Sequence, residues 1–257
     1  LSRLPEGHDV LVDPTAHDCL WAHLRMGGGA ASGHTLAWGL ANNETGVIAE
    51  PPAAPEGGWT YGARRADWLF LDIVQAVGKI PFSFAWSKAD MAVVSAHKFG
   101  GPKGAGALIL RQGIDITPLS VGGGQEMGRR AGTENLIGIA GFGAAAEAAA
   151  RDLASGVWDE VAEIRNILES ELSGPGKETI SVGNGSPRLP NTLCLIAPGW
   201  KGETQVMAMD LAGFAVSAGS ACRSMPGSIT RSFPSLPTWP ACFLTPRSCS
   251  ITWAARW

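Results

Sequence analysis

Polar residues that could do chemistry stand at the ends of short apolar runs. The runs cover residues 35–40, 68–72 and 91–95, and the polar residues that end or follow them are Asn43, Asp72, Ser95, His97 and Lys98. In an open α/β sheet, polar residues at the carboxyl ends of parallel strands build the binding site. The spacing therefore predicts that these residues share one site.

Each of these residues also has a purely structural alternative. Asn43 could hold a turn, and Asp72 could cap a helix that begins near Ile73, because aspartate is a good N-cap residue. Lys98 could be an ordinary solvated lysine. Taken one at a time, the residues leave these alternatives open, and only their recurrence at successive strand ends favours a site.

The residue types match what pyridoxal phosphate requires. A lysine beside a pocket can form a Schiff base with an aldehyde cofactor, which is the role predicted for Lys98. A carboxylate such as Asp72 keeps the pyridine nitrogen protonated, so that the ring can accept electrons. Ser95 and His97 can bind a phosphate, and the glycines of segment 100–104 let the backbone approach the cofactor without a Cβ clash. The sequence therefore predicts a pyridoxal-phosphate site.

The hydrophobic pattern indicates the elements that position these residues. Short, unbroken apolar runs separated by helix-length segments are typical of a parallel sheet buried on both faces, and a fourth run covers residues 105–110. Helices are expected over residues 134–153, 157–172 and 203–211, and further strands over 192–196 and 214–216. The predicted fold class is α/β with a mainly parallel sheet, followed by a smaller α+β domain.

A helical bridge near residues 135–155 marks the expected domain boundary. We expect residues 1–150 to form part of a large cofactor-binding domain and residues 151–257 to form a small C-terminal domain. Beyond Met225 the sequence is anomalous, because Pro, Ser, Trp and Cys crowd together and neither a helical nor a strand period survives.

Composition and charge argue against several classes of function. The 257-residue chain is 45% hydrophobic with a formal net charge of −3, so neither nucleic-acid binding nor a membrane-surface role is expected. No apolar stretch reaches the roughly 18 residues of a membrane span. The odd number of cysteines and the lack of a CxxC pair predict no metal site and no disulfide framework, which fits a reducing cytoplasm. The cysteines are Cys19, Cys194, Cys222, Cys242 and Cys249.

Several ordered motifs together resemble one enzyme family. They are ANNETGVI (41–48), LDIVQAVGKI (71–80), SAHKFGGPKGAGAL (95–108), GGGQEMGRRAGTENLIGIAGFGAAAE (122–147) and SAGSAC (217–222). In this order they resemble the NifS/IscS-type cysteine desulfurases, which belong to the class V branch of pyridoxal-phosphate fold type I. The resemblance covers residues 35–224 and implies the large domain of that fold type.

The resemblance assigns roles around the cofactor, motif by motif. It implies that Lys98 binds the aldehyde and that Asp72 contacts the pyridine nitrogen. Ser95 and His97 become phosphate ligands. The remaining hydrogen-bond partners around the ring oxygen and the substrate are Gln75 and Asn43.

Two further residues are identified by motif. Thr133 resembles a threonine that reaches the phosphate in the neighbouring subunit, which implies a homodimer; alternatively it is a helix N-cap before Glu134. Cys222 resembles the cysteine that accepts sulfur as a persulfide; alternatively it is a small buried residue. Its neighbours are small and Arg223 follows it, which favours an accessible thiolate.

The implied function is pyridoxal-phosphate-dependent conversion of L-cysteine to L-alanine. Sulfur would be held on Cys222 for iron–sulfur cluster assembly, including the clusters of nitrogen fixation. Cys222 would pass sulfur to a scaffold or other acceptor protein, and could contact a cluster there. The alternatives are a selenocysteine lyase or other class V lyase, and a truncated, inactive dimerisation partner.

Both ends depart from the family pattern. An upstream segment with a further phosphate-binding turn and a ring-stacking histidine has no match, and we assign no such role to His17 in TAHDC. The family arginine that grips the substrate carboxylate has no match after Met225. These departures predict a fragment with reading-frame changes at both ends and poor desulfurase activity.

Overall fold

The computed structural model describes residues 1–2, 4, 8–25, 32–53, 56–173, 178–218 and 250–254. The chain forms two compact units. The first comprises Leu1–Asn42 and Ala49–Val157, and the second comprises Asn43–Ile48 and Trp158–Trp257. The units thus divide at Val157, whereas the boundary predicted from the sequence falls earlier, within a helix of the first unit.

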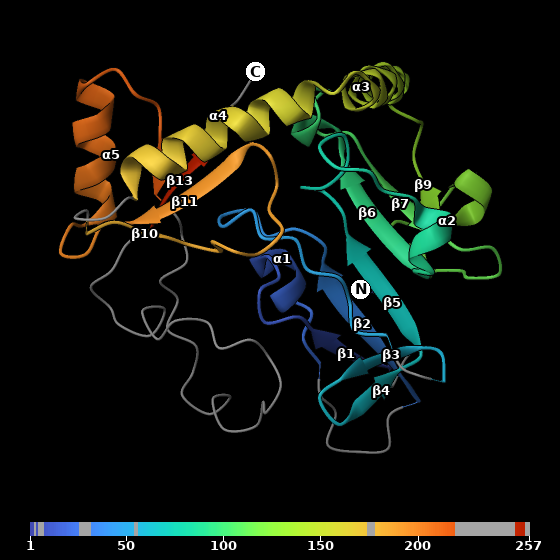
Figure 1. Cartoon of the computed structure of the whole chain (residues 1–257). Helices are drawn as coiled ribbons and strands as arrows, with labels where there is room; N and C mark the ends of the chain where they lie inside the picture. Colours follow the sequence, from blue (N-terminus) through green and yellow to red (C-terminus); the bar gives the residue numbers. More distant parts are fainter. Residues whose placement is uncertain are drawn as a thin grey trace. The chain divides into compact units, whose positions relative to one another are not determined.

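A five-stranded sheet forms the centre of the first unit (Figure 1). In sheet order its strands are β1 (His8–Val12), β2 (Gly33–Gly39), β5 (Trp68–Asp72), β6 (Met91–Ser95) and β7 (Gly106–Leu110). The first four are mutually parallel, which confirms the expected mainly parallel sheet. Strand β7 is antiparallel to β6, because the ten residues between the two strands are too few for a parallel crossover.

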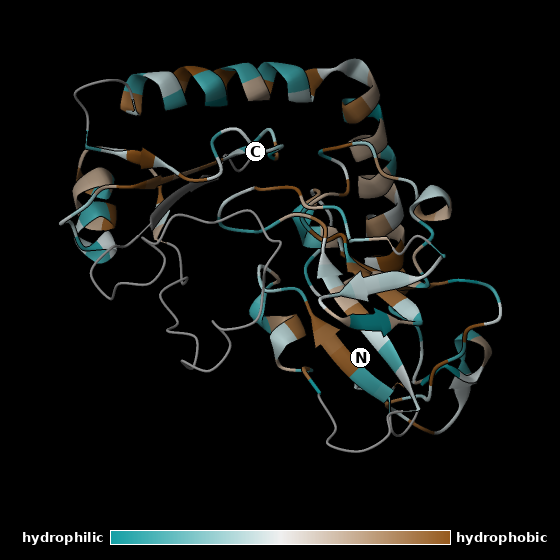
Figure 2. Ribbon diagram, turned by 60° about the horizontal axis from the view of Figure 1, so that its bottom comes forward, coloured by the Kyte–Doolittle hydropathy of each residue, from teal (hydrophilic) through white to brown (hydrophobic). Residues whose placement is uncertain are grey.

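The four parallel strands are largely buried on both faces, as their apolar runs predict, whereas the fourth predicted run forms the antiparallel strand β7, in which Gly106, Ala107 and Leu108 are exposed. Along β5, Leu69 and Leu71 belong to one core cluster, whereas Phe70 between them belongs to the cluster on the other face. In Figure 2 the strands of this sheet carry brown, hydrophobic stretches beside paler and teal ones. Strand β1 was not expected, yet Val10, Leu11 and Val12 are almost fully buried.

Helix α3 (Leu136–Ser155) packs on the loops that leave the sheet. Phe142 makes an edge-to-face contact with Phe99, the residue after η1, with ring centroids 5.3 Å apart. The other elements of this unit are short: α1 (Asp18–Trp21), β3 (Trp59–Tyr61), β4 (Arg64–Ala66), α2 (Phe84–Ser87), η1 (Ala96–Lys98), β8 (Gly124–Gln125), η2 (Glu126–Gly128) and β9 (Arg130–Ala131). No helix within the described ranges combines the length and hydropathy that a membrane span needs.

The second unit is α+β, as expected. Its helices are α4 (Val157–Leu172), which starts at the last residue of the first unit, and α5 (Gly202–Leu211). Its antiparallel sheet has the order β10 (Ile180–Ser181), β11 (Thr192–Ile196), β13 (Ser250–Ala254) and β12 (Ser217–Ala218). The strand expected at 214–216 is wrong: residues 214–216 are irregular and the strand begins at Ser217.

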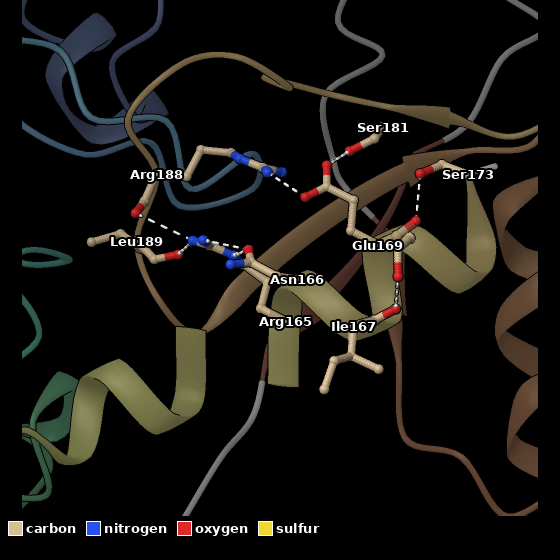
Figure 3. Close-up of polar contacts among 9 residues, drawn as sticks. Arg165, Asn166, Ile167, Glu169, Ser173, Ser181, Arg188 and Leu189 are labelled. Carbon is tan, nitrogen blue, oxygen red and sulfur yellow. Dashed lines mark hydrogen bonds and ion pairs between the residues drawn. The ribbon is translucent and has the colours of Figure 1, made fainter. Parts of the chain in front are cut away.

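A buried ion pair holds α4 to this sheet (Figure 3). The Glu169 carboxylate accepts hydrogen bonds from the Ser181 hydroxyl and from the Arg188 guanidinium, whose side chain is 7% exposed. Arg165, also on α4, donates to the Leu189 carbonyl at 2.7 Å. Burial alone would raise the pKa of Glu169, but the hydrogen bonds and the arginine charges outweigh it and lower this pKa below the ordinary 4.5.

We expect Glu169→Gln to lower the unfolding free energy of the second unit by about 3 kcal/mol, because it leaves a buried arginine without its counter-charge. The ion pair contributes fully above the ordinary carboxyl pKa of 4.5, and its contribution is lost as the pH falls through the lowered value. Urea unfolding followed by tryptophan fluorescence, at pH 7 and at pH 4, measures both effects. Glu171→Gln, on the exposed side of α4, is the matched control; an equal loss in both variants would contradict this account.

Candidate active site

The parallel strands end at one edge of the sheet, and polar residues gather there. Asp72 is the last residue of β5, and it pairs with Gly39 at the end of β2. Ser95 is the last residue of β6, and His97 and Lys98 follow it in η1. Since β5 and β6 are neighbours in the sheet, Asp72 and the η1 residues belong to one locale.

The two oxygens of Asp72 have different surroundings. Oδ1 accepts a hydrogen bond of 3.0 Å from the Val74 backbone N–H, whereas Oδ2 lies 4.0 Å from the Cys19 Sγ. Burial raises the pKa of Asp72, while the Val74 hydrogen bond and the charges of His17 and Lys98 oppose the shift. The helix-capping alternative is therefore correct only in part: Asp72 accepts from a nearby N–H, but residues 74–79 form turns rather than a helix.

The segment after β6 is a tight turn that presents its polar side chains. Ser95 Oγ lies 2.8 Å from His97 Nδ1, and His97 and Lys98 are both exposed. The Gly101 N–H closes the turn on the Ala96 carbonyl at 2.8 Å. A Cβ at Gly101 would lie 2.7 Å from the Ala96 Cβ, so only glycine fits there. Lys98 is thus exposed, as the surface alternative required, but its charge acts on Asp72.

The structure describes the remaining predicted residues to different extents. Asn43 lies in the 43–48 segment, which belongs to the second unit. Thr133 is exposed and follows β9; it is not the N-cap of α3, because the Asn135 side chain accepts from Gly138 N–H at 3.0 Å in that role. Cys222 lies outside the described residues. Gln75, by contrast, lies on the turn directly after Asp72 and is half-buried.

His17 also lies near Asp72, although the sequence analysis assigned it no role. It follows β1, caps α1 by accepting a 3.1 Å hydrogen bond from the Cys19 N–H at Nδ1, and lies near enough to Asp72 for its charge to act on that carboxyl. The only sequence signal for it was the short apolar run VLV (10–12) before TAHDC, which the structure shows as a buried strand. The polar residues His8 and Asp9 at its start obscured it.

The group has the side chains that pyridoxal phosphate needs: an amine, a carboxylate and a serine hydroxyl. Gly100 and Gly104, on the loop after Lys98, both have positive φ, and a Cβ at either would meet nothing within 4 Å. The loop beside Lys98 therefore leaves open space, and these residues fit the cofactor. Among the described residues, no group of three or more His, Cys, Asp and Glu side chains is arranged to bind a metal ion.

The sequence matches the aminotransferase class-V family model over residues 34–233. The chain belongs to the class V aminotransferase family. Among the relatives of this class V chain is a cysteine desulfurase of Klebsiella pneumoniae, 44% identical over 185 residues, which are 72% of this chain and 45% of that protein. Another is a cysteine desulfurase of Bradyrhizobium diazoefficiens, 44% identical over 77% of this chain and 50% of the relative. The class V chain spans about half the length of the curated relatives it matches.

Solved structures carry the same fold as this class V chain. A NifS-like protein from Rickettsia africae superposes with a TM-score of 0.72 at 24% identity, over 96% of this chain and 70% of its own. A second NifS-like protein has a TM-score of 0.67 at 28% identity, over 82% of this chain and 63% of its own. The fold is therefore pyridoxal-phosphate fold type I, and the cofactor of the family is pyridoxal phosphate.

Proposed function

We propose that this protein is a pyridoxal-phosphate-dependent cysteine desulfurase, which converts L-cysteine to L-alanine and retains the sulfur as a persulfide. The observation that carries the proposal is the placement of Lys98 and Asp72 at adjacent strand ends, where the lysine charge acts on the carboxyl. The relatives named cysteine desulfurase support the choice of reaction within the family.

Each residue at the strand ends has a separate role in the proposed reaction. When bound, pyridoxal phosphate would supply an electron sink, and the Lys98 amine would hold the cofactor and move the substrate Cα proton. The Asp72 carboxylate would keep the ring nitrogen protonated, and the hydrogen bond from the Val74 N–H to Oδ1 orients this carboxylate. Ser95 and His97, which are linked by their 2.8 Å contact, bind the phosphate.

The remaining assignments rest on sequence motifs. Gln75 and Asn43 contact the ring oxygen and the substrate, and Thr133 reaches the phosphate of the second subunit in a homodimer. The Cys222 thiolate takes the sulfur atom of L-cysteine, so that one cysteine and one thiol become one alanine and one persulfide. An acceptor protein of iron–sulfur cluster assembly removes this sulfur, in the reducing cytoplasm that free thiols require.

We expect Cys222→Ala to keep the bound-cofactor absorption band and to lose persulfide formation, because the thiol acts after the substrate has bound. The measurement is alanine and persulfide formation from L-cysteine, with Cys242→Ala as the matched cysteine control. If the Cys222→Ala variant still delivered sulfur at the wild-type rate, Cys222 would not be the sulfur acceptor. Activity of this variant on selenocysteine alone would favour a selenocysteine lyase, and a wild-type protein without a cofactor band would favour an inactive dimerisation partner.

A further inference from the structure

Lys79 is a buried lysine on the turn that follows Asp72. Its side chain is among the buried charged groups, with 7% of the residue exposed. Its Nζ donates a hydrogen bond of 2.8 Å to the Gln75 backbone carbonyl, one helical turn earlier in the chain. This bond links the two ends of the segment that carries Gln75.

The turn is held at its start by local hydrogen bonds and at its end by close packing against α3 and Phe99. At its start, Val74 N–H donates to Asp72 Oδ1, and the Ile73 carbonyl accepts from the N–H of Val77 at 3.1 Å. At its end, Gly78 has φ +77°, and a Cβ there would lie 2.9 Å from the Ala149 Cβ of α3 and 3.2 Å from the Phe99 Cβ. A shift of this turn would therefore move Gln75 relative to Lys98 and disturb the Val74 hydrogen bond that orients the Asp72 carboxylate.

The buried ammonium is unfavourable for folding by itself. Burial lowers the pKa of Lys79 to about 8, and the positive charge of Lys98 contributes to the shift. An unbranched apolar side chain such as methionine would fill the same space without that desolvation. A side chain that weakens folding at neutral pH while it fixes a site-bearing turn points to a role in the site.

We propose that Lys79 is a positioning residue, whose bond to the Gln75 carbonyl holds the 73–80 turn so that Asp72 and Gln75 face the cofactor. Lys79 acts through this turn and does not itself touch substrate or cofactor. The inference rests on the proposed cofactor site, and its test includes a measurement on the cofactor-free protein.

The test compares Lys79→Met with Lys79→Arg, which keeps the charge and the donor, and with Lys103→Met on the exposed loop after Lys98. In Lys79→Met we expect pyridoxal phosphate to bind about tenfold more weakly, as for one lost charge-assisted hydrogen bond, with an unchanged or higher Tm. In the cofactor-free protein the Val74 amide should exchange its hydrogen at least about tenfold faster, because the turn is looser. Lys79→Arg should keep the wild-type cofactor affinity and Val74 exchange rate. Lys103→Met should change neither of them.

A positioning role predicts that Lys79→Met lowers the affinity for pyridoxal phosphate without lowering the Tm, whereas a general structural role predicts that both fall. A fall in Tm together with affinity in Lys79→Met, without rescue by arginine, would overturn the proposal. Unchanged affinity and unchanged Val74 exchange would overturn it too. If the wild-type protein does not bind pyridoxal phosphate, the proposed function fails, and the Val74 exchange still decides whether Lys79 holds the turn.

Discussion

Replacing Lys98 by alanine should abolish covalent attachment of pyridoxal phosphate and lower alanine formation by about 10³-fold or more, because proton transfer by a positioned side chain alone contributes about 10²–10⁴-fold. The residue is suited to this role because it is exposed at the end of η1, beside open space at Gly100 and Gly104. Borohydride reduction followed by peptide mapping should find the pyridoxyl group on Lys98.

The matched control is Lys103→Ala, on the same loop and also exposed. It should keep both the attached cofactor and the activity. A pyridoxyl group on Lys103 or on the buried Lys79 would show that the cofactor lies elsewhere, and the assignment of Asp72 and Ser95 would fail with it.

Replacing Asp72 by asparagine should leave the cofactor bound but lower turnover by about 10²–10³-fold, because a neutral amide cannot hold the ring nitrogen protonated. The stability of the folded protein, in contrast, should not fall in this variant. Burial raises the pKa of Asp72 above its ordinary 3.8, so the folded state favours the protonated, uncharged carboxyl. The ionised carboxyl is therefore disfavoured in the fold once the pH has risen through the raised value, and at pH 7 the neutral asparagine variant should be at least as stable as wild type.

The measurement pairs steady-state turnover with thermal unfolding at pH 7. Asp152→Asn on the exposed side of α3 serves as the control, with both properties unchanged. In wild type, the activity should begin to fall at a higher pH than for a solvated aspartate as the medium is acidified. If Asp72→Asn and the wild-type protein had equal turnover, the proposed role of Asp72 at the ring nitrogen would be wrong.

Burial on both faces made the strands of the sheet readable from the sequence. The runs at 68–72 and 91–95 are strands with the predicted bounds, because a strand covered on both sides has apolar residues at every position. Strand β1 was not predicted because it starts with two polar residues, His8 and Asp9. The structure buries both, with His8 stacked on Trp68 at 4.8 Å and Asp9 3.8 Å from Arg64. These contacts come from distant segments, which local pattern cannot indicate.

The same limit applies to the site. Asp72, Ser95, His97 and Lys98 were predictable because each stands directly at the end of a readable strand. His17 was not, since it depends on β1. The N-cap of α3 was also ambiguous locally, because Thr133 and Asn135 can both cap a helix, and only the bond to Gly138 decides between them. Lys79 resembles any solvated lysine in the sequence, and its burial is a property of the packed turn.

The 4.0 Å approach of Cys19 Sγ to Asp72 Oδ2 affects how sulfur transfer can be probed. Alkylating reagents are the usual way to assign a reactive cysteine, yet an adduct on the exposed Cys19 would place bulk against the carboxylate and inhibit without touching Cys222. Burial and the Asp72 charge raise the pKa of Cys19 above 9.0, so this thiol is a poor nucleophile at neutral pH and reacts increasingly as the solution becomes alkaline. Inactivation by thiol reagents is therefore free of a contribution from Cys19 only in a Cys19→Ser background.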